Sequence, residues 1–465
     1  MNGVPCTLIE PGIGEWRRAG IDRDGIPVSL DHLSDPLLNA TGALFDARVT
    51  RVDAVADLAF LDLGNGRTGV MNQRRARLRK KGRSLSIRDS LTEGERLRVQ
   101  AVHDAEGLED KAISVTPRPR LVGRYCTVEQ AAGRLNFSKD LGPTVVKRLT
   151  AALGPLPEEA ALLIRGRADR VDPAIVAAEA SHLTRQIIRD VGAPGLVFVE
   201  PMSGRSLIDL DDSNHPILVE GGSAYAALMA LADSRFPDLA PRLSLWRGEG
   251  SMMEDCGVEE SIEEALSERI PLPSGGWLSV HPTPALTAID VNMGSAWKAA
   301  DAAEAKLTVN LEAALAVAWN IRFQNIGGLI VIDFINMTGK DRLARLVETL
   351  KQAVREDPVQ PQISGMSAFG LVQINRAKRG PSLRDRMLQE RAPLPRPKAA
   401  AASLLRRAQR VGLSPDVGNL HLSAPEGVID WLKQNPHWTE VLSNETGRPV
   451  TLSIGTRGPW IERVT

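Results

Sequence analysis

The sequence contains little cysteine and few aromatic residues, and no part of it resembles a membrane or export signal. Only three cysteines, Cys6, Cys126 and Cys256, occur among 465 residues. They are far apart and odd in number, so they form neither a disulfide framework nor a metal-binding motif, which is typical of a reducing compartment. No apolar run reaches the roughly 18 residues of a membrane helix, and the first residues lack the basic-then-apolar pattern of a signal peptide. We therefore expect a cytoplasmic protein without a membrane span.

The overall charge excludes little, because 57 Lys and Arg balance 57 Asp and Glu and the formal net charge is zero. Basic residues are nevertheless concentrated in two runs. Residues 74–88 hold eight cations and no acid, and residues 375–391 hold six cations and two acids. Such runs bind phosphates in nucleic-acid-binding proteins, and they also occur as solvated loops. Beside a nucleic-acid-binding fold, two such runs favour RNA or DNA as the partner.

A compact all-β unit is predicted near the N-terminus. At roughly 150 residues per domain the chain should contain about three domains. Residues 42–118 hold five segments of alternating apolar and polar residues with Gly, Asn and Asp at the turns, which predicts five strands. Five short strands with a basic loop after the third indicate an OB-fold barrel, which commonly binds single-stranded nucleic acid. Phe60 could be a stacking platform on this barrel or part of its core, with the core slightly favoured.

The remainder of the chain alternates between helices and strands, which predicts a multidomain α/β protein. Residues 281–390 contain two apolar strands separated by one long helix, then a further helix and a third strand. The Pro/Ala-rich segment 391–402 predicts a linker, and a small α+β region follows it.

Two of these apolar strands carry polar residues that could bind a cation. The strand "GLIVIDFIN" contains Asp333, which we expect to be buried, and ends at Asn336; the strand "PALTAIDVN" contains Asp290 and Asn292. Strand ends commonly form the binding crevice of α/β layers. Magnesium favours one or two carboxylates together with water and phosphate oxygens. This pattern allows a metal site, although buried Asp residues also cap turns.

The same residues lie within motifs of a known family. The segments "LPSGGWLSVHPTPALTAIDVN", "VNLEAA" and "NIGGLIVIDFINMTG" resemble the catalytic signature of the ribonuclease E/G family. Further similarity runs through "LVGRY", "LLIRGRA" and "FGLVQINRAKRGPSL", and the barrel "GALFDARVTRVD…AFLDLG" resembles that family's inserted RNA-binding domain.

The resemblance implies an arrangement of domains. It consists of an RNase H-like domain (1–38 and 212–280), an OB-fold barrel (39–118), a five-prime-sensor-like region (119–211), a DNase I-like catalytic domain (281–390), a linker (391–412) and a small domain (413–465).

The resemblance also implies roles for the strand-end residues. The family cuts single-stranded RNA with a magnesium ion held by two aspartates. The first corresponds to Asp290, which Asn292 orients, and the second corresponds to Asn336. Asp333 matches an acid that is structural in the family. Because an amide carries no charge, we expect weaker metal binding, with manganese as an alternative ion.

Further residues match RNA contacts of the family. They are Phe60 and Lys111 on the barrel, Arg376 and Lys378 after the catalytic strand, and Gly123 and Arg165 in the five-prime-phosphate sensor. Other positions depart from the family, namely Val70, Gly166, Pro284, Trp319, Asn320 and Gln324. The two-cysteine zinc motif is missing, so neither zinc nor the zinc-linked tetramer is expected, and a homodimer is left open.

Three functions are compatible with these observations. The first is a metal-dependent endoribonuclease of the E/G type acting in RNA processing, rRNA processing or decay, with attenuated activity. The second is an RNA-binding protein that no longer cuts. The third is a regulatory partner on the same scaffold. Asp290, Asn292, Asp333 and the cations favour the first function, whereas Asn336 and Pro284 favour the second.

Overall fold

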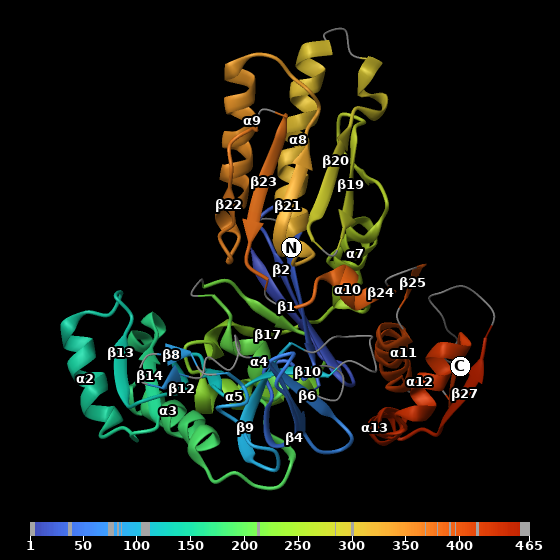
Figure 1. The fold of residues 1–465 in the computed structure, drawn as a ribbon. Coiled ribbons are helices and arrows are strands. Elements are labelled where there is room, and N and C mark those ends of the chain that lie inside the picture. Colours follow the sequence, from blue (N-terminus) through green and yellow to red (C-terminus); the bar gives the residue numbers. More distant parts are fainter. Residues whose placement is uncertain are drawn as a thin grey trace. The chain divides into compact units, whose positions relative to one another are not determined.

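The computed structural model describes a mixed α/β protein with several sheets, as predicted (Figure 1). It covers residues 5–35, 40–72, 79–80, 83–84, 86–103, 112–211, 214–283, 285–298, 302–367, 369–378, 380–389, 392–395, 397–414 and 418–455. The first compact unit comprises Met1–Leu8, Ala19–Asp31 and Gly248–Ala400, and the second comprises Ile9–Arg18, His32–Arg247 and Ala401–Thr465. Within the described ranges, no helix is long and apolar enough to cross a membrane.

A closed five-stranded barrel lies in the second unit, as the alternating segments predict. Its strands pair in the order β4-β5-β6-β10-β9, and β9 pairs back with β4. Only β6 and β10 are parallel to each other. Alternate residues such as Ala59, Leu61 and Val99 fill the interior. The strands are β4 (Leu44–Asp53), β5 (Leu58–Asp62), β6 (Thr68–Asn72), β9 (Arg96–His103) and β10 (Ile113–Thr116), with β15 (Gly195–Phe198) paired to β4 and a short hairpin of β7 (Arg79–Lys80) and β8 (Arg83–Ser84).

A four-stranded sheet of order β11-β12-β14-β13 shares a core with helix α3 in the same unit. The end of α3 is fastened to the barrel by the buried Arg98, which is paired with Asp46 at 2.7 Å. The Arg98 guanidinium also donates to the carbonyls of Ile187 at 3.1 Å and Arg189 at 2.7 Å. The elements are β11 (Arg120–Val122), β12 (Cys126–Gln130), β13 (Arg134–Phe137), β14 (Ala160–Ile164), α2 (Pro143–Leu153), the 3-10 helix η1 (Gly166–Arg170) and α3 (Pro173–Ile188).

A five-stranded sheet of order β17-β16-β1-β2-β3 includes one strand, β2, that the sequence did not predict. Strand β2 carries the buried Arg17, whose guanidinium is paired with the buried Glu10 at 2.6 Å. The elements are β1 (Cys6–Glu10), β2 (Glu15–Ile21), β3 (Pro27–Ser34), β16 (Ile217–Val219), β17 (Leu243–Leu245), α4 (Met202–Ile208), α5 (Gly222–Arg235) and η2 (Ala240–Arg242).

The prediction of a linker over 391–412 is wrong from residue 397 onward, because Pro397–Gly412 forms helix α11. Proline is favoured at the first helical position and alanine is the best helix former, so "PKAAAA" begins a helix. Arg406, on α11, is buried and pairs with Glu15 at 3.0 Å. The small region that follows contains β26 (Leu420–Ala424), α12 (Glu426–Gln434), α13 (His437–Thr446) and β27 (Val450–Ile454). The sequence also predicts a strand at "WIERV", residues 460–464, which lie outside the described residues.

The first unit contains a six-stranded sheet of order β18-β19-β20-β21-β23-β22, in which only β20 and β21 are parallel. Helices α8 and α9 run along the sheet (Figure 1) and share a core with its buried residues, such as Ile289, Ile330 and Ile374. The strands of this sheet are β18 (Ile270–Pro271), β19 (Trp277–Pro282), β20 (Thr287–Asn292), β21 (Gly328–Asp333), β22 (Gln362–Ile363) and β23 (Leu371–Arg376). A separate pair consists of β24 (Leu388–Gln389) and β25 (Ala392–Pro395). The helices are α6 (Met252–Asp255), α7 (Val258–Leu266), η3 (Gly294–Lys298), α8 (Ala302–Phe323), α9 (Lys340–Ala353), η4 (Val354–Glu356) and α10 (Leu383–Met387).

Candidate functional site

Asp290 and Asp333 lie side by side on the face of the sheet opposite the core. They are register partners on the parallel strands β20 and β21, in a row with Ser279 on β19 and Leu371 on β23. Paired residues of neighbouring parallel strands point to the same face, and adjacent strands lie about 4.8 Å apart. Both aspartate side chains are exposed. Two carboxylates are therefore presented to solvent at the carboxyl ends of adjacent strands.

The expectation that Asp333 is buried is wrong. Ile330, Ile332 and Phe334 face the core, whereas Leu329 is 41% exposed and Asp333 is exposed on the other face. The sequence hid this alternation, because the outward positions 329 and 331 are also apolar. Asp333 consequently needs no buried partner.

Asn292 holds the carboxylate of Asp290. Its Nδ2 donates a hydrogen bond to Asp290 Oδ2 at 2.6 Å. The two side chains lie two residues apart on β20 and therefore share a face. The contact fixes the orientation of the Asp290 carboxylate.

Asn336 follows β21 in a segment that a buried asparagine holds in place. Asn310, on α8, is fully buried and makes two hydrogen bonds with Ile335. Asn310 Nδ2 donates to the Ile335 carbonyl at 2.8 Å, and the Ile335 N–H donates to Asn310 Oδ1 at 2.9 Å. Asn336 itself is exposed, and a Cβ at Gly370 would lie 3.2 Å from its Oδ1. Asn310 belongs to the "NLEAA" motif, and no role is predicted for this residue from the sequence. A buried amide on a helix beside the strand end could have indicated one.

The same motif holds the segment before β19, which in turn lies against the segment that follows β20. Glu312 Oε2 accepts hydrogen bonds from the N–H of Ser274 at 3.0 Å and from its hydroxyl at 2.6 Å. Gly294 has a φ of +50°, and a Cβ there would lie 2.2 Å from the carbonyl oxygen of Gly275. Only glycine permits this close approach. The "LPSGG" and "NLEAA" segments thus fix the chain on both sides of the strand ends.

The two cations that follow the catalytic strand differ in environment. Arg376 is 3% exposed, and its guanidinium donates to Asp357 at 2.8 Å and to the carbonyl of Ile326 at 3.1 Å. The expectation that Arg376 faces RNA is therefore wrong, because its donors are engaged in the interior. Lys378 is exposed, and its backbone lies close enough to Gly327 that a Cβ there would be 2.8 Å from Lys378 Cα.

Phe60 lies on the outer side of the barrel, so the slightly favoured core placement is wrong. Its neighbours Ala59 and Leu61 are fully buried, whereas Phe60 is half-buried and the guanidinium of Arg51 lies 4.3 Å from its ring centroid. Val70 is its register partner on β6. Lys111 lies outside the described residues, as does most of the basic run 74–88.

Gly123 and Arg165, predicted as sensor residues, are in contact. The Arg165 guanidinium donates to the Gly123 carbonyl at 2.6 Å and lies 3.9 Å from the exposed Asp209. Gly123 is buried, and a Cβ there would lie 2.5 Å from Glu179 Cδ, so a larger residue would collide with that carboxyl group. Glu179 accepts backbone N–H bonds from Arg124 and Tyr125 at 2.8 Å each.

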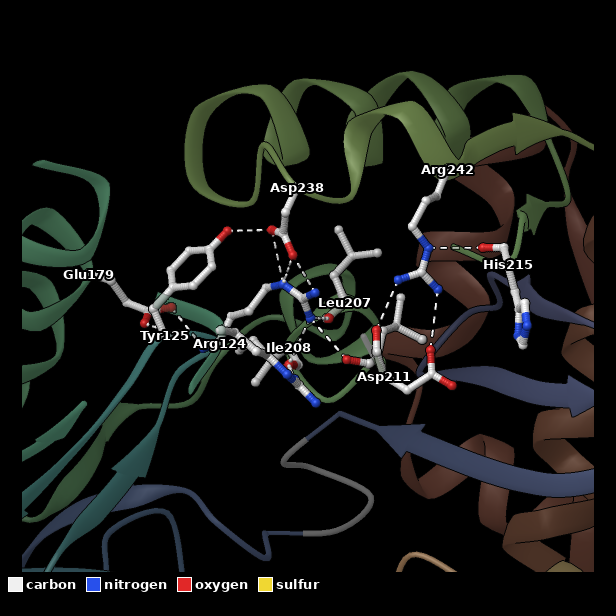
Figure 2. Close-up of polar contacts among 11 residues, drawn as sticks. Arg124, Tyr125, Glu179, Leu207, Ile208, Asp211, His215, Asp238 and Arg242 are labelled. Carbon is white, nitrogen blue, oxygen red and sulfur yellow. Dashed lines mark hydrogen bonds and ion pairs between the residues drawn. The ribbon is translucent and has the colours of Figure 1, made fainter. Parts of the chain in front are cut away.

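The residues next to Gly123 belong to a buried polar network, which Figure 2 shows with Arg124 between Asp238 and backbone carbonyls. Arg124 is fully buried, and its Nε lies 2.8 Å from Asp238 Oδ2. Burial alone would raise the pKa of Asp238, but hydrogen bonds from Arg124 and Tyr125 hold it below its usual value. Burial raises the pKa of Glu179 despite its N–H donors. The buried Arg242 donates to the His215 carbonyl at 2.9 Å in the same view.

The comparisons with known proteins agree with these motifs. The sequence profile of the ribonuclease E/G family matches residues 120–379, more than half of the chain. The chain belongs to the ribonuclease E/G family. It is similar to ribonuclease G of Escherichia coli strain K12, at 27% identity over 356 residues that span 72% of each chain. It is also similar to ribonuclease E of the same strain, at 29% identity over 370 residues, which span 73% of this chain and 34% of the relative.

Several departures from the ribonuclease E/G motifs have structural roles. Asn320 and Gln324 on α8 are buried, and Gln324 Nε2 donates to Asn320 Oδ1 and to the Ala265 carbonyl, each at 2.8 Å. Trp319 Nε1 donates to the Pro27 carbonyl at 2.7 Å. These residues therefore stabilise the first unit. Pro284 lies outside the described residues.

The oxygen donors at the strand ends suit a small divalent cation. The described residues include no group of three or more His, Cys, Asp or Glu side chains that could hold a metal. Asp290 and Asp333 provide carboxylate oxygens and Asn336 provides an amide oxygen, all exposed. Oxygen-only sets with one or two carboxylates fit magnesium or manganese, whereas structural zinc sites use thiolate and imidazole.

Proposed function

We propose that this protein is an endoribonuclease that cleaves single-stranded RNA with the help of a magnesium or manganese ion. Membership of the ribonuclease E/G family supports the reaction class. The observation that carries the proposal is the placement of Asp290, held by Asn292 and directly beside the exposed Asp333 at the ends of two parallel strands. In this proposal the catalytic domain, 281–390, is DNase I-like. The domain of residues 1–38 and 212–280, which contains the five-stranded sheet, is RNase H-like.

The proposed metal site combines Asp290, Asn336 and Asp333. Asn336 offers a neutral carbonyl oxygen where the family pattern has an aspartate. Asp333 compensates for part of that lost charge, because its exposed carboxylate is the register partner of Asp290. When bound, the ion supplies Lewis-acid stabilisation of the charge that develops on the phosphodiester.

The chain's own residues orient and bind the substrate. Asn292 keeps the Asp290 carboxylate in one orientation, and Asn310 fixes the segment that carries Asn336. The exposed ammonium of Lys378 is free to bind a backbone phosphate, a sequence-independent contact that weakens with salt.

The closed barrel is proposed to bind nucleotides of the RNA other than those at the phosphodiester that is cut. Its strand order, with the third and fifth strands parallel, supports the proposal of an OB fold. Phe60 and Arg51 present an aromatic ring and a cation on its outer side, the combination on which unpaired bases and phosphates bind. Lys111 is proposed to add a phosphate contact. Arg165, held at Gly123, is proposed to bind a five-prime monophosphate.

The test is a gel cleavage assay on a single-stranded, five-prime-monophosphorylated, A/U-rich RNA with magnesium, manganese or chelator. Asp290→Ala should lower the cleavage rate by roughly 100-fold or more, because a metal contributes several kcal/mol to the transition state. Asp430→Ala removes an exposed acid of α12 and serves as the matched control. Cleavage that persists in chelator, or that Asp290→Ala leaves unchanged, would contradict the proposal.

A second candidate is an RNA-binding protein that does not cut, and the uncharged Asn336 favours it. In that case the RNA would be retarded in the gel without cleavage in any metal. Absence of both cleavage and retardation would favour the regulatory partner on the same scaffold.

A further inference from the structure

One aromatic ring, that of Phe369, is exposed close to the candidate metal site. Phe369 is 89% exposed, whereas every other Phe, Tyr and Trp whose side chain is described is buried or half-buried. An exposed phenyl ring forgoes the stabilisation that its burial would contribute. Packing therefore gives no reason for an aromatic residue at this position.

The turn that carries Phe369 is well defined by hydrogen bonds. The Ser367 N–H donates to the Leu371 carbonyl at 2.8 Å, and the Gly370 N–H donates to the Ser367 carbonyl at 3.0 Å. The Ser367 hydroxyl accepts from the N–H of Leu371 at 3.1 Å and from that of Phe369 at 3.3 Å. Gly370 has a φ of +81°, a conformation that favours glycine. The ring is thus presented from a turn with fixed ends.

This turn lies at the end of the sheet at which the proposed metal ligands are placed. Leu371 is the register partner of Asp333, which is in turn the partner of Asp290. Because β23 runs antiparallel to β21, residues 369 and 370 precede β23 at the same end of the sheet at which Asn336 follows β21. Gly370 lies against Asn336, since a Cβ at position 370 would be 3.2 Å from Asn336 Oδ1.

We propose that Phe369 is a positioning residue that stacks on an unpaired RNA base next to the phosphate to be cut. This inference rests on the proposed ribonuclease function. An exposed ring offers a π face that accepts any base, and such stacking contributes about 1–3 kcal/mol per base. Stacking would hold the flanking nucleotide while the phosphodiester lies at Asp290 and Asn336. A double-stranded RNA, whose bases are already stacked on each other, would not gain this contact.

The first measurement uses the full chain carrying Asp290→Ala, so that bound RNA is not cut. A single-stranded RNA containing one 5-iodouridine is bound and irradiated, and the crosslinked residue is found by peptide mass spectrometry. This photoreaction favours an aromatic side chain stacked on the base. When the position of 5-iodouridine is varied along the RNA, a crosslink at Phe369 is expected from one position beside the cleavage site.

The second measurement is RNA affinity in low-salt gel shifts. Phe369→Leu keeps an apolar side chain without a π face and should weaken binding roughly five- to 150-fold, which corresponds to the stacking energy. Phe369→Trp should retain binding. Leu315→Ala, at a 56% exposed residue of α8, is the control for removal of an exposed apolar side chain.

The outcomes separate this inference from the proposed function. If the parent protein binds and cuts RNA, but no crosslink maps to Phe369 and Phe369→Leu binds as tightly as the parent, the inference is wrong and the ring serves another contact. If the parent protein neither binds nor cuts RNA, the proposed function fails and the inference fails with it.

Discussion

The polar side chains of the strand-end site and those of the sensor-like region lie in opposite environments. At the strand ends, the side chains of Asp290, Asp333 and Asn336 are exposed. Among the described residues, their only hydrogen bond is the one that Asp290 accepts from Asn292. In the sensor-like region, Arg124 is fully buried and bound to Asp238 and to three backbone carbonyls (Figure 2).

The difference separates a binding site from a structural network. Exposed oxygens with few partners remain available to a cation, and removing one costs the fold little. A buried guanidinium must be paired. Removing the guanidinium, or removing its carboxylate partner, therefore lowers stability before it affects activity. Stability and activity measurements on matched variants can therefore test the assignment of each region.

The largest effect on stability is expected from Asp238→Ala. It leaves the fully buried Arg124 without its carboxylate and should lower the free energy of unfolding by about 3–5 kcal/mol. Asp290→Ala, on an exposed side chain, should change it by no more than about 0.5 kcal/mol. Urea denaturation followed by circular dichroism measures both. Asp233→Ala, an exposed acid of α5, is the control for Asp238→Ala.

The ion pair of Arg124 and Asp238 also predicts that stability depends on pH. The pKa of Asp238 is below its ordinary value of 3.8 in the folded protein, so its contribution to stability is present above pH 3.8 and is lost as the pH falls through the folded pKa. Asp238→Ala should remove this part of the acid sensitivity. A loss below 1 kcal/mol for Asp238→Ala at neutral pH would mean that the network does not hold the fold.

Long patterned elements could be predicted from the sequence. The barrel strands and helices α3 and α8 follow from alternation or helical periodicity, because each presents one apolar face to a core. Strand β2 was missed, since its buried Arg17 interrupts the apolar pattern and is compensated by Glu10 on another strand. Helix α11 was missed because Pro393, Pro395 and Pro397, at and before its start, predicted a linker.

Residue types at the site were predictable from motifs, but their environments were not. An acid in an apolar strand suggested burial, yet Asp333 is exposed; a cation in a basic run suggested exposure, yet Arg376 is buried. Both depend on which face of a strand a residue occupies and on partners distant in sequence, such as Asp357. The positioning role of Asn310 depends likewise on a contact between α8 and the strand end.

Arg376 and Lys378 allow the comparison to be made within one segment. Arg376→Gln leaves the buried Asp357 without its ion-pair partner and should lower the free energy of unfolding by about 3–5 kcal/mol. Lys378→Gln should leave stability within about 0.5 kcal/mol. It should also weaken RNA binding and reduce the slope of log affinity against log salt by about 0.7, the value for one phosphate contact to a single strand. Urea denaturation and salt-dependent gel shifts measure the two effects.

These two variants could also reverse the assignment. If Arg376→Gln folded as stably as the parent and lost RNA affinity with a smaller salt slope, the guanidinium would have to leave Asp357 to bind RNA. The interior position described above would then be one of two conformations.

The smallest effect is expected from Asn336→Asp, which tests whether the strand ends form one metal site. The added carboxylate should strengthen Mn2+ binding and raise the cleavage rate at limiting metal by about tenfold, or about 1.4 kcal/mol. Asp333→Asn should weaken both, and Asn336→Asp should restore them in the double variant, because either acid then supplies the second negative charge beside Asp290. Isothermal titration with Mn2+ reports binding independently of activity. If Asp333→Asn left Mn2+ affinity unchanged while Asn336→Asp raised it, Asp333 would lie outside the metal's coordination, and the site would depend on Asp290 and the amide alone.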